Sequence, residues 1–143
     1  DIKHLGLIAT EATINSGILE EKIKNLGIKV TSKPAPELVE LAQNMEIGEQ
    51  AEKVVSNSLD DFKSIGIDAF YLGCTHFSLI RKEIEGQINA KIIDPAKQTS
   101  IDLEDYIETK SGPTNLYFHC SQEDGVHKES VKKILGDLDV RVR

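Results

Sequence analysis

The chain has 143 residues, of which 39% are hydrophobic and 29% are charged, so it is long enough and apolar enough to bury the core of one ordinary domain. Its formal net charge of −7 argues against a nucleic-acid-binding surface, which needs a stripe of basic residues. No apolar run approaches the length of about 18 residues that favours a membrane span. The two cysteines lie far apart in the sequence, which favours a cytoplasmic protein in a reducing compartment.

The start of the chain predicts a strand, a helix and a second strand. His4 to Ala9 is an apolar run typical of a strand, and a helical pattern follows from about Glu11 to Leu26. Thr10 stands at the position of a helix N-cap. The second strand is expected at Ile28 to Thr31, and Pro34 should end it because proline cannot donate a hydrogen bond to a strand ladder.

The middle of the chain alternates helices with strands. Pro36 suits the first turn of a helix, and an amphipathic helix is expected from about Ile47 to Ile65. The later elements are a strand at Ala69 to Leu72, a helix that begins near Phe77 with Arg81 and Lys82 on its outer side, a strand at Lys91 to Ile93 and a helix at Gln98 to Thr109.

The end of the chain follows Ser111-Gly112-Pro113, which is the clearest linker in the sequence. The elements expected beyond it are a strand at Asn115 to His119, a helix at Glu123 to Leu135 and a last strand at Val140 to Val142. Strands that alternate with helices are typical of an α/β fold with a parallel, doubly wound sheet. We expect that sheet in residues 1–110 and a separate strand-helix-strand segment in residues 111–143.

The most informative stretch is DAFYLGCTHFSL, from Asp68 to Leu79. A short apolar strand reaches Gly73, which is expected to permit a sharp reversal of the backbone, and Cys74, Thr75 and His76 follow in a row. Ligands of α/β proteins bind at the carboxyl ends of such strands. A cysteine in the first turn of a helix, with an imidazole two residues on, is favoured as thiolate.

Two other interpretations of these residues stay open. Free cysteine is among the most buried residue types, so Cys74 could be an inert core residue. A zinc site could combine Cys74 and His76 with His119 and Cys120, but the sequence lacks the usual spacing of zinc ligands. We therefore predict no metal site and interpret Cys120 as a core thiol.

The string LGCTHFSL resembles the second catalytic motif of the glutamate racemases. GLIATEATINSG, from Gly6 to Gly17, is similar to a strand-helix segment of the same family, and collinear similarities continue at Ile93-Asp94 and from Leu116 to Ser121. The resemblance covers nearly the whole chain. Aspartate racemases read C-T-E at the position of C-T-H, so His76 points to the glutamate branch.

The resemblance implies a cofactor-independent interconversion of L- and D-glutamate for peptidoglycan synthesis, in which two cysteines act as the bases. Cys74 would be the catalytic cysteine that acts on L-glutamate. His76 would be its general acid/base partner and a substrate contact, and Thr75 would bind the substrate. The implied ligands are therefore L- and D-glutamate, with no cofactor, no membrane and no nucleic acid, and a homodimer is common among relatives.

Two motifs of the family have no counterpart in this sequence. These are an aspartate-serine loop near the start of family members and a first catalytic cysteine in a T-N-C motif. The chain therefore resembles the second racemase lobe, residues 1–110, followed by a segment, residues 111–143, that returns to the first lobe. Because the chain starts at Asp1 without a methionine, we expect that the numbering does not begin where the gene does, and that the chain alone is inactive.

One position departs from the family pattern. Collinear matching from Pro36 places Gln43 where relatives carry a glutamate thought to assist the histidine, and an amide cannot ionise. Glu40 or Glu46 would serve in a different register, but otherwise they are solvated helix surface. The departure leaves an alternative function open, namely a non-catalytic racemase-like α/β domain that binds a ligand or a partner.

Overall fold

The computed structural model of the chain describes residues 1–46, 48–107, 116–118, 125–136 and 140–142. The chain divides into two units, Asp1–Glu104 and Asp105–Arg143, and each is taken by itself. The boundary predicted between residues 110 and 111 and the linker at 111–113 lie outside the described residues. The division into a lobe and a return segment therefore stays a prediction.

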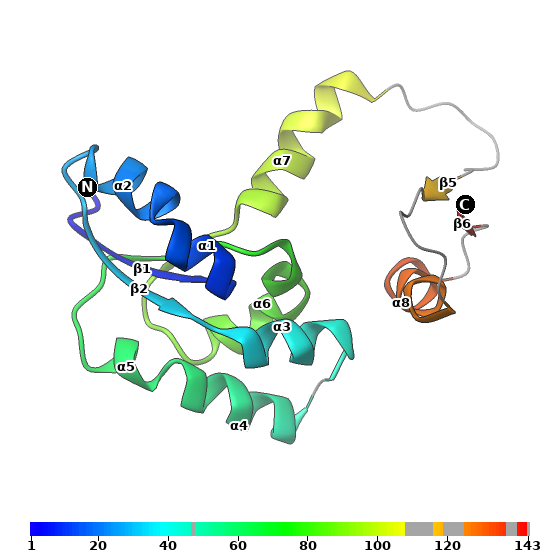
Figure 1. Cartoon of the computed structure of the whole chain (residues 1–143), viewed down its shortest axis with the longest axis horizontal. Coiled ribbons are helices and arrows are strands. Elements are labelled where there is room, and N and C mark those ends of the chain that lie inside the picture. The colour runs from blue at the N-terminus through cyan, green and yellow to red at the C-terminus, as the bar shows by residue number, and fades with distance from the viewer. Residues whose placement is uncertain (47, 108–115, 119–124, 137–139, 143) are drawn as a thin grey trace. The chain divides into compact units, whose positions relative to one another are not determined.

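Four parallel strands form the sheet of the first unit in the order β2-β1-β3-β4. Figure 1 labels β1 and β2 of this sheet. Their bounds are β1 His4–Ala9, β2 Lys29–Pro34, β3 Ala69–Leu72 and β4 Lys91–Ile93. The bounds of β1, β3 and β4 agree with those predicted, and the parallel α/β class is confirmed. Because β1 pairs with β2 on one side and with β3 on the other, the chain reverses its direction of travel across the sheet between β1 and β3.

Strand β2 runs further than the sequence predicted. Pro34 was expected to end the ladder, but it lies opposite Ala9 in the register of β1 and β2. The next residue, Ala35, donates its backbone N–H to the carbonyl of Ala9 at 3.0 Å. Because β2 is at the edge of the sheet, the proline can lie with its nitrogen on the side that has no neighbouring strand, and no ladder bond is lost.

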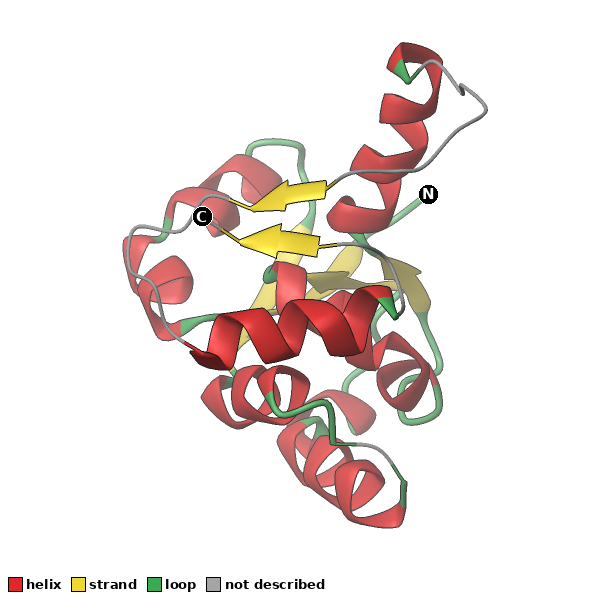
Figure 2. Ribbon diagram, turned by 90° about the vertical axis from the view of Figure 1, so that its right-hand side faces the viewer, coloured by secondary structure: helices red, strands yellow, loops and turns green. Residues whose placement is uncertain are grey.

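Helices cover both faces of this sheet, so the predicted doubly wound arrangement is confirmed (Figures 1 and 2). Their bounds are α1 Glu11–Ser16, α2 Ile18–Lys24, α3 Pro36–Gln43, α4 Glu49–Ser58, α5 Asp60–Lys63, α6 Arg81–Glu85 and α7 Pro95–Leu103, with 3-10 helices η1 at Thr75–Ile80 and η2 at Glu104–Tyr106. Helices α1 and α2 pack on one face, and α3 to α6 pack on the other.

Both long helices of the prediction are broken in the structure. The first is interrupted at Gly17, which has a left-handed φ of 67° and separates α1 from α2. The second is interrupted at Leu59, which is fully buried and lies between α4 and α5. Helix α7 begins at Pro95, three residues before the predicted start at Gln98, because Asp94 caps it and proline fits its first turn.

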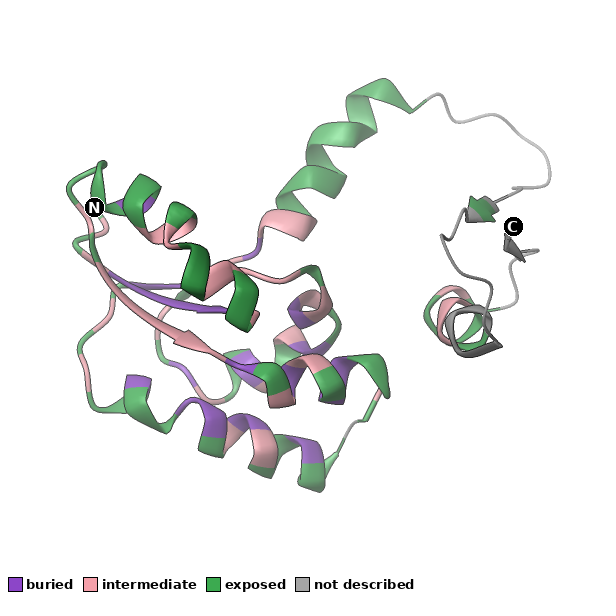
Figure 3. Cartoon of the chain, in the orientation of Figure 1, coloured by how far each residue is buried: buried purple, intermediate pink, exposed green. Residues whose placement is uncertain are grey.

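The larger core lies under α3 to α6, and its centre is aromatic. Phe62 of α5 and Phe70 of β3 meet edge to face, with ring centroids 5.0 Å apart, and burial of each such ring stabilises the fold by about 1.5–3 kcal/mol. Figure 3 shows β1 buried along most of its length, whereas α1 and α7 are largely exposed. Within the described residues, no helix is long and apolar enough to cross a bilayer.

The described residues after 107 form two parallel strands and a helix. Strand β5, Leu116–Phe118, pairs with β6, Val140–Val142, and helix α8, Gly125–Leu135, connects them in sequence. These are the three elements predicted for this part of the chain. A helical crossover is what a parallel pair of strands requires.

Candidate active site

The carboxyl edge of the sheet is where the predicted site residues meet. The strand order changes direction between β1 and β3, and the crevice beyond such a switch point is where open α/β sheets bind ligands. Thr10 is the first residue after β1, and Cys74 is the second residue after β3. Since Ile8 pairs with Leu72 in the register of the two strands, Thr10 and Cys74 come at the same level on the two sides of this switch point.

Gly73 brings β3 unusually close to β1 at this edge. Its backbone N–H donates to the carbonyl of Ile8 at 2.7 Å. A Cβ at Gly73 would lie 2.8 Å from that carbonyl oxygen and 2.8 Å from Cβ of Ala9. The sequence predicted a glycine needed for a sharp reversal, but Gly73 is not among the glycines with a left-handed φ. Close approach of the two strands is therefore the reason for glycine here.

The thiol of Cys74 lies at the start of a 3-10 helix rather than an α-helix. Cys74 is the N-cap of η1 with an extended backbone, φ −139° and ψ 136°, and its carbonyl accepts the N–H of Phe77 at 3.1 Å. The α-helix predicted to begin near Phe77 starts only at Arg81. Phe77 and Ile80 are buried in the larger core, and they hold η1 against the sheet.

Cys74 and His76 are in direct contact. Sγ of Cys74 lies 3.5 Å from Nδ1 of His76, and both side chains are half-buried. The pair can exist as a thiol that donates to a neutral imidazole or as a thiolate that accepts from an imidazolium. Thr75 lies between them in sequence and is exposed, so its hydroxyl is available to a ligand. The structure thus places all three predicted residues at one edge of the sheet.

A small hollow opens beside the thiol. Its volume is about 150 Å³, and it is lined by Leu19, Tyr71, Leu72, Gly73, Cys74, Thr75, Pro95 and Ala96. Burial raises the pKa of Tyr71 above its ordinary value of 10.0, so its phenol stays neutral at physiological pH. Ligand pockets usually measure about 300–1,000 Å³, so this hollow is smaller than a typical ligand pocket.

A second cavity of about 600 Å³ lies between the end of β1 and α3. Thr10, Glu40 and Gln43 are among the residues that line it. Thr10 is the N-cap of α1 as predicted, since its hydroxyl accepts the N–H of Thr13 at 3.2 Å. Glu40, Gln43 and Glu46 are all exposed, as expected for solvated helix surface, but Glu46 does not line the cavity. Of the two candidate glutamates, only Glu40 thus faces this part of the sheet edge.

A cluster around Asp94 was not predicted, although Ile93-Asp94 was among the similarities to the family. Asp94 is buried, and its carboxylate accepts from the hydroxyl of Ser78 at 2.8 Å. Arg81 was predicted to point outward, but its guanidinium binds Glu85 at 2.7 Å and lies 3.6 Å from the Asp94 carboxylate. The Asp-Pro pair after a strand was the available signal, because aspartate and proline are typical of the first two positions of a helix.

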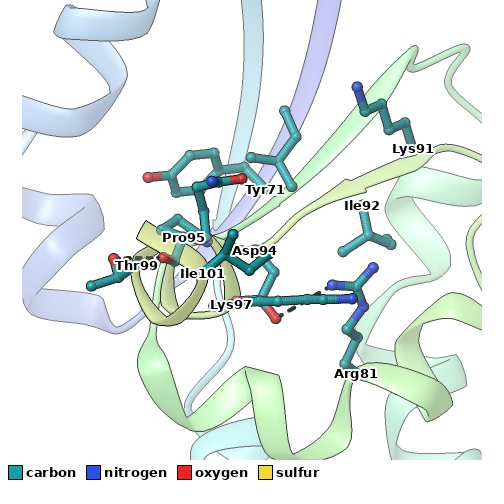
Figure 4. Close-up of a pocket in the computed structure, with 11 residues that line it drawn as sticks. Tyr71, Arg81, Lys91, Ile92, Asp94, Pro95, Lys97, Thr99 and Ile101 are labelled. Atoms are coloured by element: carbon teal, nitrogen blue, oxygen red, sulfur yellow. Dashed lines mark hydrogen bonds and ion pairs between the residues drawn. The ribbon is translucent and has the colours of Figure 1, made fainter. Parts of the chain in front are cut away.

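Figure 4 shows Asp94 and Arg81 of this cluster at the wall of a third cavity, of about 620 Å³, which residues of β4 and α7 also line. Tyr71 and Pro95 line both this cavity and the hollow beside Cys74. The two spaces are therefore separated by these side chains.

The described residues do not support the zinc interpretation. No group of three or more possible metal ligands occurs among the described residues. His119 and Cys120 lie outside the described residues, so the structure says nothing of their position relative to Cys74.

Comparison with known proteins agrees with the resemblance noted in the sequence. The profile of the Asp/Glu/Hydantoin racemase family matches residues 1–99. The glutamate racemase of Aquifex aeolicus is 37% identical to the chain over 138 residues, which are 94% of this chain and 53% of that protein. The chain spans about half the length of the curated relatives it matches.

Solved structures of glutamate racemases have a similar fold. The enzyme from Francisella tularensis, solved in complex with D-glutamate, is 27% identical with a TM-score of 0.76, over 99% of this chain and 57% of that one. The enzyme from Aquifex pyrophilus is 33% identical with a TM-score of 0.61, over 98% of this chain and 56% of that one.

Proposed function

The chain belongs to the Asp/Glu/Hydantoin racemase family, and on that premise we propose that it supplies one half of the active site of a glutamate racemase. The observation that carries the proposal is the contact between Sγ of Cys74 and Nδ1 of His76, 3.5 Å long, at the carboxyl edge of the sheet. This is where an α/β fold binds its ligand. Similarity to glutamate racemases supports glutamate as the substrate.

In the proposed reaction the thiolate of Cys74 removes the α-proton of L-glutamate. The electron pair left on the α-carbon is delocalised into the carboxylate, and a second thiol on the opposite face donates a proton to give D-glutamate. In each turnover Cys74 therefore gains one proton and the second thiol loses one, with no oxidation or reduction. We assign the second thiol to another lobe of the whole protein.

His76 and Thr75 have separate roles in this scheme. The imidazole of His76 contacts Cys74 and can hold the proton that the thiol exchanges, and a well-placed acid or base contributes about 10²- to 10⁴-fold in rate. Thr75 is exposed beside the thiol, and its hydroxyl and backbone N–H would bind the substrate carboxylate. Donors of this kind stabilise the carbanion most when water is excluded from the site.

A carboxylate that acts on His76 would help it to hold a proton, and of the two candidate glutamates we assign this role to Glu40 rather than Glu46. Glu40 lines the cavity that Thr10 borders, and α3 packs against η1, which carries His76. Glu46 is engaged by the side chain of Asn44 at 3.3 Å and does not line that cavity. In the whole protein, Glu40→Gln should slow racemisation, whereas Glu46→Gln should leave its rate close to that of the wild type.

The proposal extends to the setting of the reaction. Two thiols perform the proton transfers, so no pyridoxal phosphate takes part. D-Glutamate is a building block of peptidoglycan, and its synthesis would take place in the cytoplasm by a homodimeric enzyme. The family resemblance is the support for these further points.

The experiment that tests the proposal compares the two cysteines of this chain in the whole protein. We expect Cys74→Ser to abolish formation of D-glutamate, measured by chiral chromatography. Cys120→Ser, the matched control, should retain it. An unchanged rate in Cys74→Ser would refute the assignment of the catalytic thiol.

The alternative is a racemase-like domain that binds glutamate without turning it over. It is favoured by Gln43, because an amide stands where a glutamate is expected and cannot take up a proton. Calorimetry separates the two functions, since binding of L- or D-glutamate without turnover by the whole protein would support the alternative. Competition with aspartate and with a hydantoin would show whether His76 selects glutamate.

A further inference from the structure

Asp94 connects three elements at the end of β4. Its side chain is 3% exposed. One carboxylate oxygen, Oδ1, accepts the hydroxyl of Ser78 at 2.8 Å and the backbone N–H of Lys97 at 3.2 Å. The other oxygen, Oδ2, lies 3.6 Å from a guanidinium nitrogen of Arg81. A single buried carboxylate thus ties β4, the first turn of α7 and the η1-α6 segment together.

The η1 segment depends on such ties because of its geometry. Short 3-10 helices have poorer hydrogen bonds than α-helices and seldom extend beyond three or four residues. Buried Phe77 and Ile80 hold η1 on the side of the core. The hydroxyl of Ser78 in η1 donates a hydrogen bond to Asp94, which is the N-cap of α7. Ser78 is two residues from His76, so a shift of η1 at Ser78 would also move the imidazole.

Arg81 keeps the carboxylate itself in place. Two nitrogens of its guanidinium, Nε and Nη2, each lie 2.7 Å from Oε1 of Glu85. The rigid guanidinium stands against the face of Asp94 that Ser78 and Lys97 do not occupy. Because a buried carboxylate without partners is strongly unfavourable, Asp94 has little freedom to leave this position.

We infer that Asp94 and Ser78 are positioning residues, which fix the distance between Cys74 and His76 by anchoring η1 to the end of β4. The inference rests on the proposed function, because it concerns the same Cys74-His76 pair. Neither residue touches the thiol. Their effect reaches it only through the backbone of η1.

The test measures the reactivity of Cys74 in this chain as a function of pH. Alkylation by iodoacetamide is followed by mass spectrometry of the peptide that contains Cys74, and modification of Cys120 in the same digest is the internal reference. The titratable groups beside the thiol are His76, which contacts it, and Tyr71, which lines the same hollow. Ser78→Ala removes one hydroxyl. His76→Ala removes the imidazole and gives the pH-rate profile of Cys74 without any influence of His76.

We expect Ser78→Ala to shift the pH-rate profile of Cys74 toward that of His76→Ala. The alkylation rate near neutral pH should change by about two- to tenfold, which corresponds to the net free energy of one hydrogen bond. Ser78→Thr keeps a hydroxyl and should restore the wild-type profile. Ser64→Ala, which removes an exposed hydroxyl that bonds only the carbonyl of Asp61, should have no effect. A purely stabilising role would lower the melting temperature but leave the profile in place.

The outcomes separate the two proposals. A wild-type profile in Ser78→Ala, together with a shifted profile in His76→Ala, overturns the positioning role and leaves the proposed function intact. A wild-type profile in both variants shows that the imidazole does not act on the thiol, and overturns both. Asp94→Asn provides a second variant, because its amide oxygen can still accept from Ser78. It should fold and shift the profile less than Ser78→Ala, and the reverse order contradicts the inference.

Discussion

Gly73 is a residue at which the backbone of a neighbouring strand leaves no room for a side chain. Its N–H binds the carbonyl of Ile8, and a Cβ would come within 2.8 Å of backbone and side-chain atoms of β1. Backbone atoms within a sheet cannot move aside as the end of a flexible side chain can. The glycine therefore sets how closely Cys74 approaches the end of β1, and so contributes to the shape of the site.

We predict that Gly73→Ala destabilises the fold by about 1–3 kcal/mol, the usual cost of adding a methyl group to a packed region. The urea midpoint of unfolding measures this change. Gly66→Ala is the matched control, because nothing lies within 4 Å of its added Cβ. Its midpoint should equal or slightly exceed that of the wild type. Equal midpoints for the two variants would contradict the close approach.

Asp68 links the first residues of the chain to the start of β3. Its carboxylate accepts the backbone N–H groups of His4 at 2.9 Å and Lys3 at 2.8 Å. These hydrogen bonds hold the pKa of Asp68 below its ordinary value of 3.8, and the bond from His4 has the larger effect. Because the pKa is lower in the folded state, the contribution to stability is present above the unfolded pKa and is lost as the pH falls through the folded pKa.

We therefore expect the wild-type chain to lose stability between about pH 5 and about pH 2 more steeply than Asp68→Asn does. Both N–H groups donate to the same oxygen, Oδ2. Asparagine keeps an oxygen that can accept from them there, but it does not titrate. Urea unfolding at a series of pH values gives the two slopes. If the slopes are the same, the hydrogen bonds of Asp68 do not contribute to the acid sensitivity of the fold.

At the scale of elements, the junction between α1 and α2 shows how one residue divides a helix. Gly17 donates its N–H to the carbonyl of Ile14 at 3.0 Å and adopts the left-handed conformation, which ends α1. Helix α2 then starts in a new direction, and its Leu19 lines the hollow beside Cys74. The glycine thus determines which residue of this segment reaches the site.

We predict that Gly17→Ala costs about 1–2 kcal/mol, because a residue with a Cβ is strained in the left-handed region. Nothing lies within 4 Å of the added Cβ, so the cost comes from the backbone alone. Gly17→Asn should cost less, since asparagine tolerates this conformation. Thermal and urea unfolding measure both variants. Equal stability of the alanine and asparagine variants would show that the junction can relax.

The elements also show what the sequence could and could not predict. Apolar runs bounded by polar residues gave the bounds of β1 and β3, because burial on both faces requires such runs. The extension of β2 to Pro34 depends on its place at the sheet edge, which is a tertiary property. Helix η1 packs against α3, α7 and β3, and its Ser78 bonds Asp94, the residue after β4. No periodicity in the sequence signals these tertiary contacts or the 3-10 form of η1.

At the scale of the whole molecule, the first unit taken by itself offers only a small hollow beside the thiol of Cys74. The hollow beside Cys74 measures about 150 Å³, which is below the usual size of a ligand pocket. The described residues bring one cysteine to this edge. The motif LGCTHFSL predicted that Cys74, Thr75 and His76 follow the end of a strand, as they do after β3, and their roles stay a prediction. The sequence order alone could not place Thr10 at the same level across the switch point.

We predict that this chain alone does not convert L-glutamate into D-glutamate, because proton donation on the second face needs a second thiol and a closed site. Chiral chromatography after incubation measures the product. The glutamate racemase of Aquifex aeolicus is 37% identical to this chain over the 138 residues that align. Fusion of this chain to the upstream part of that enzyme should give measurable racemisation. That activity should disappear in Cys74→Ser and persist in Cys120→Ser.

In deuterium oxide the two stages of the reaction can be separated. Removal and return of the proton on one face by Cys74 alone would give L-glutamate labelled at the α-carbon, with no D-glutamate. A water-accessible site stabilises the carbanion poorly, so we expect this labelling to be slow in the chain alone and fast in the fusion. Formation of D-glutamate by the chain alone would contradict the two-lobe scheme, since both proton transfers would then take place within these 143 residues.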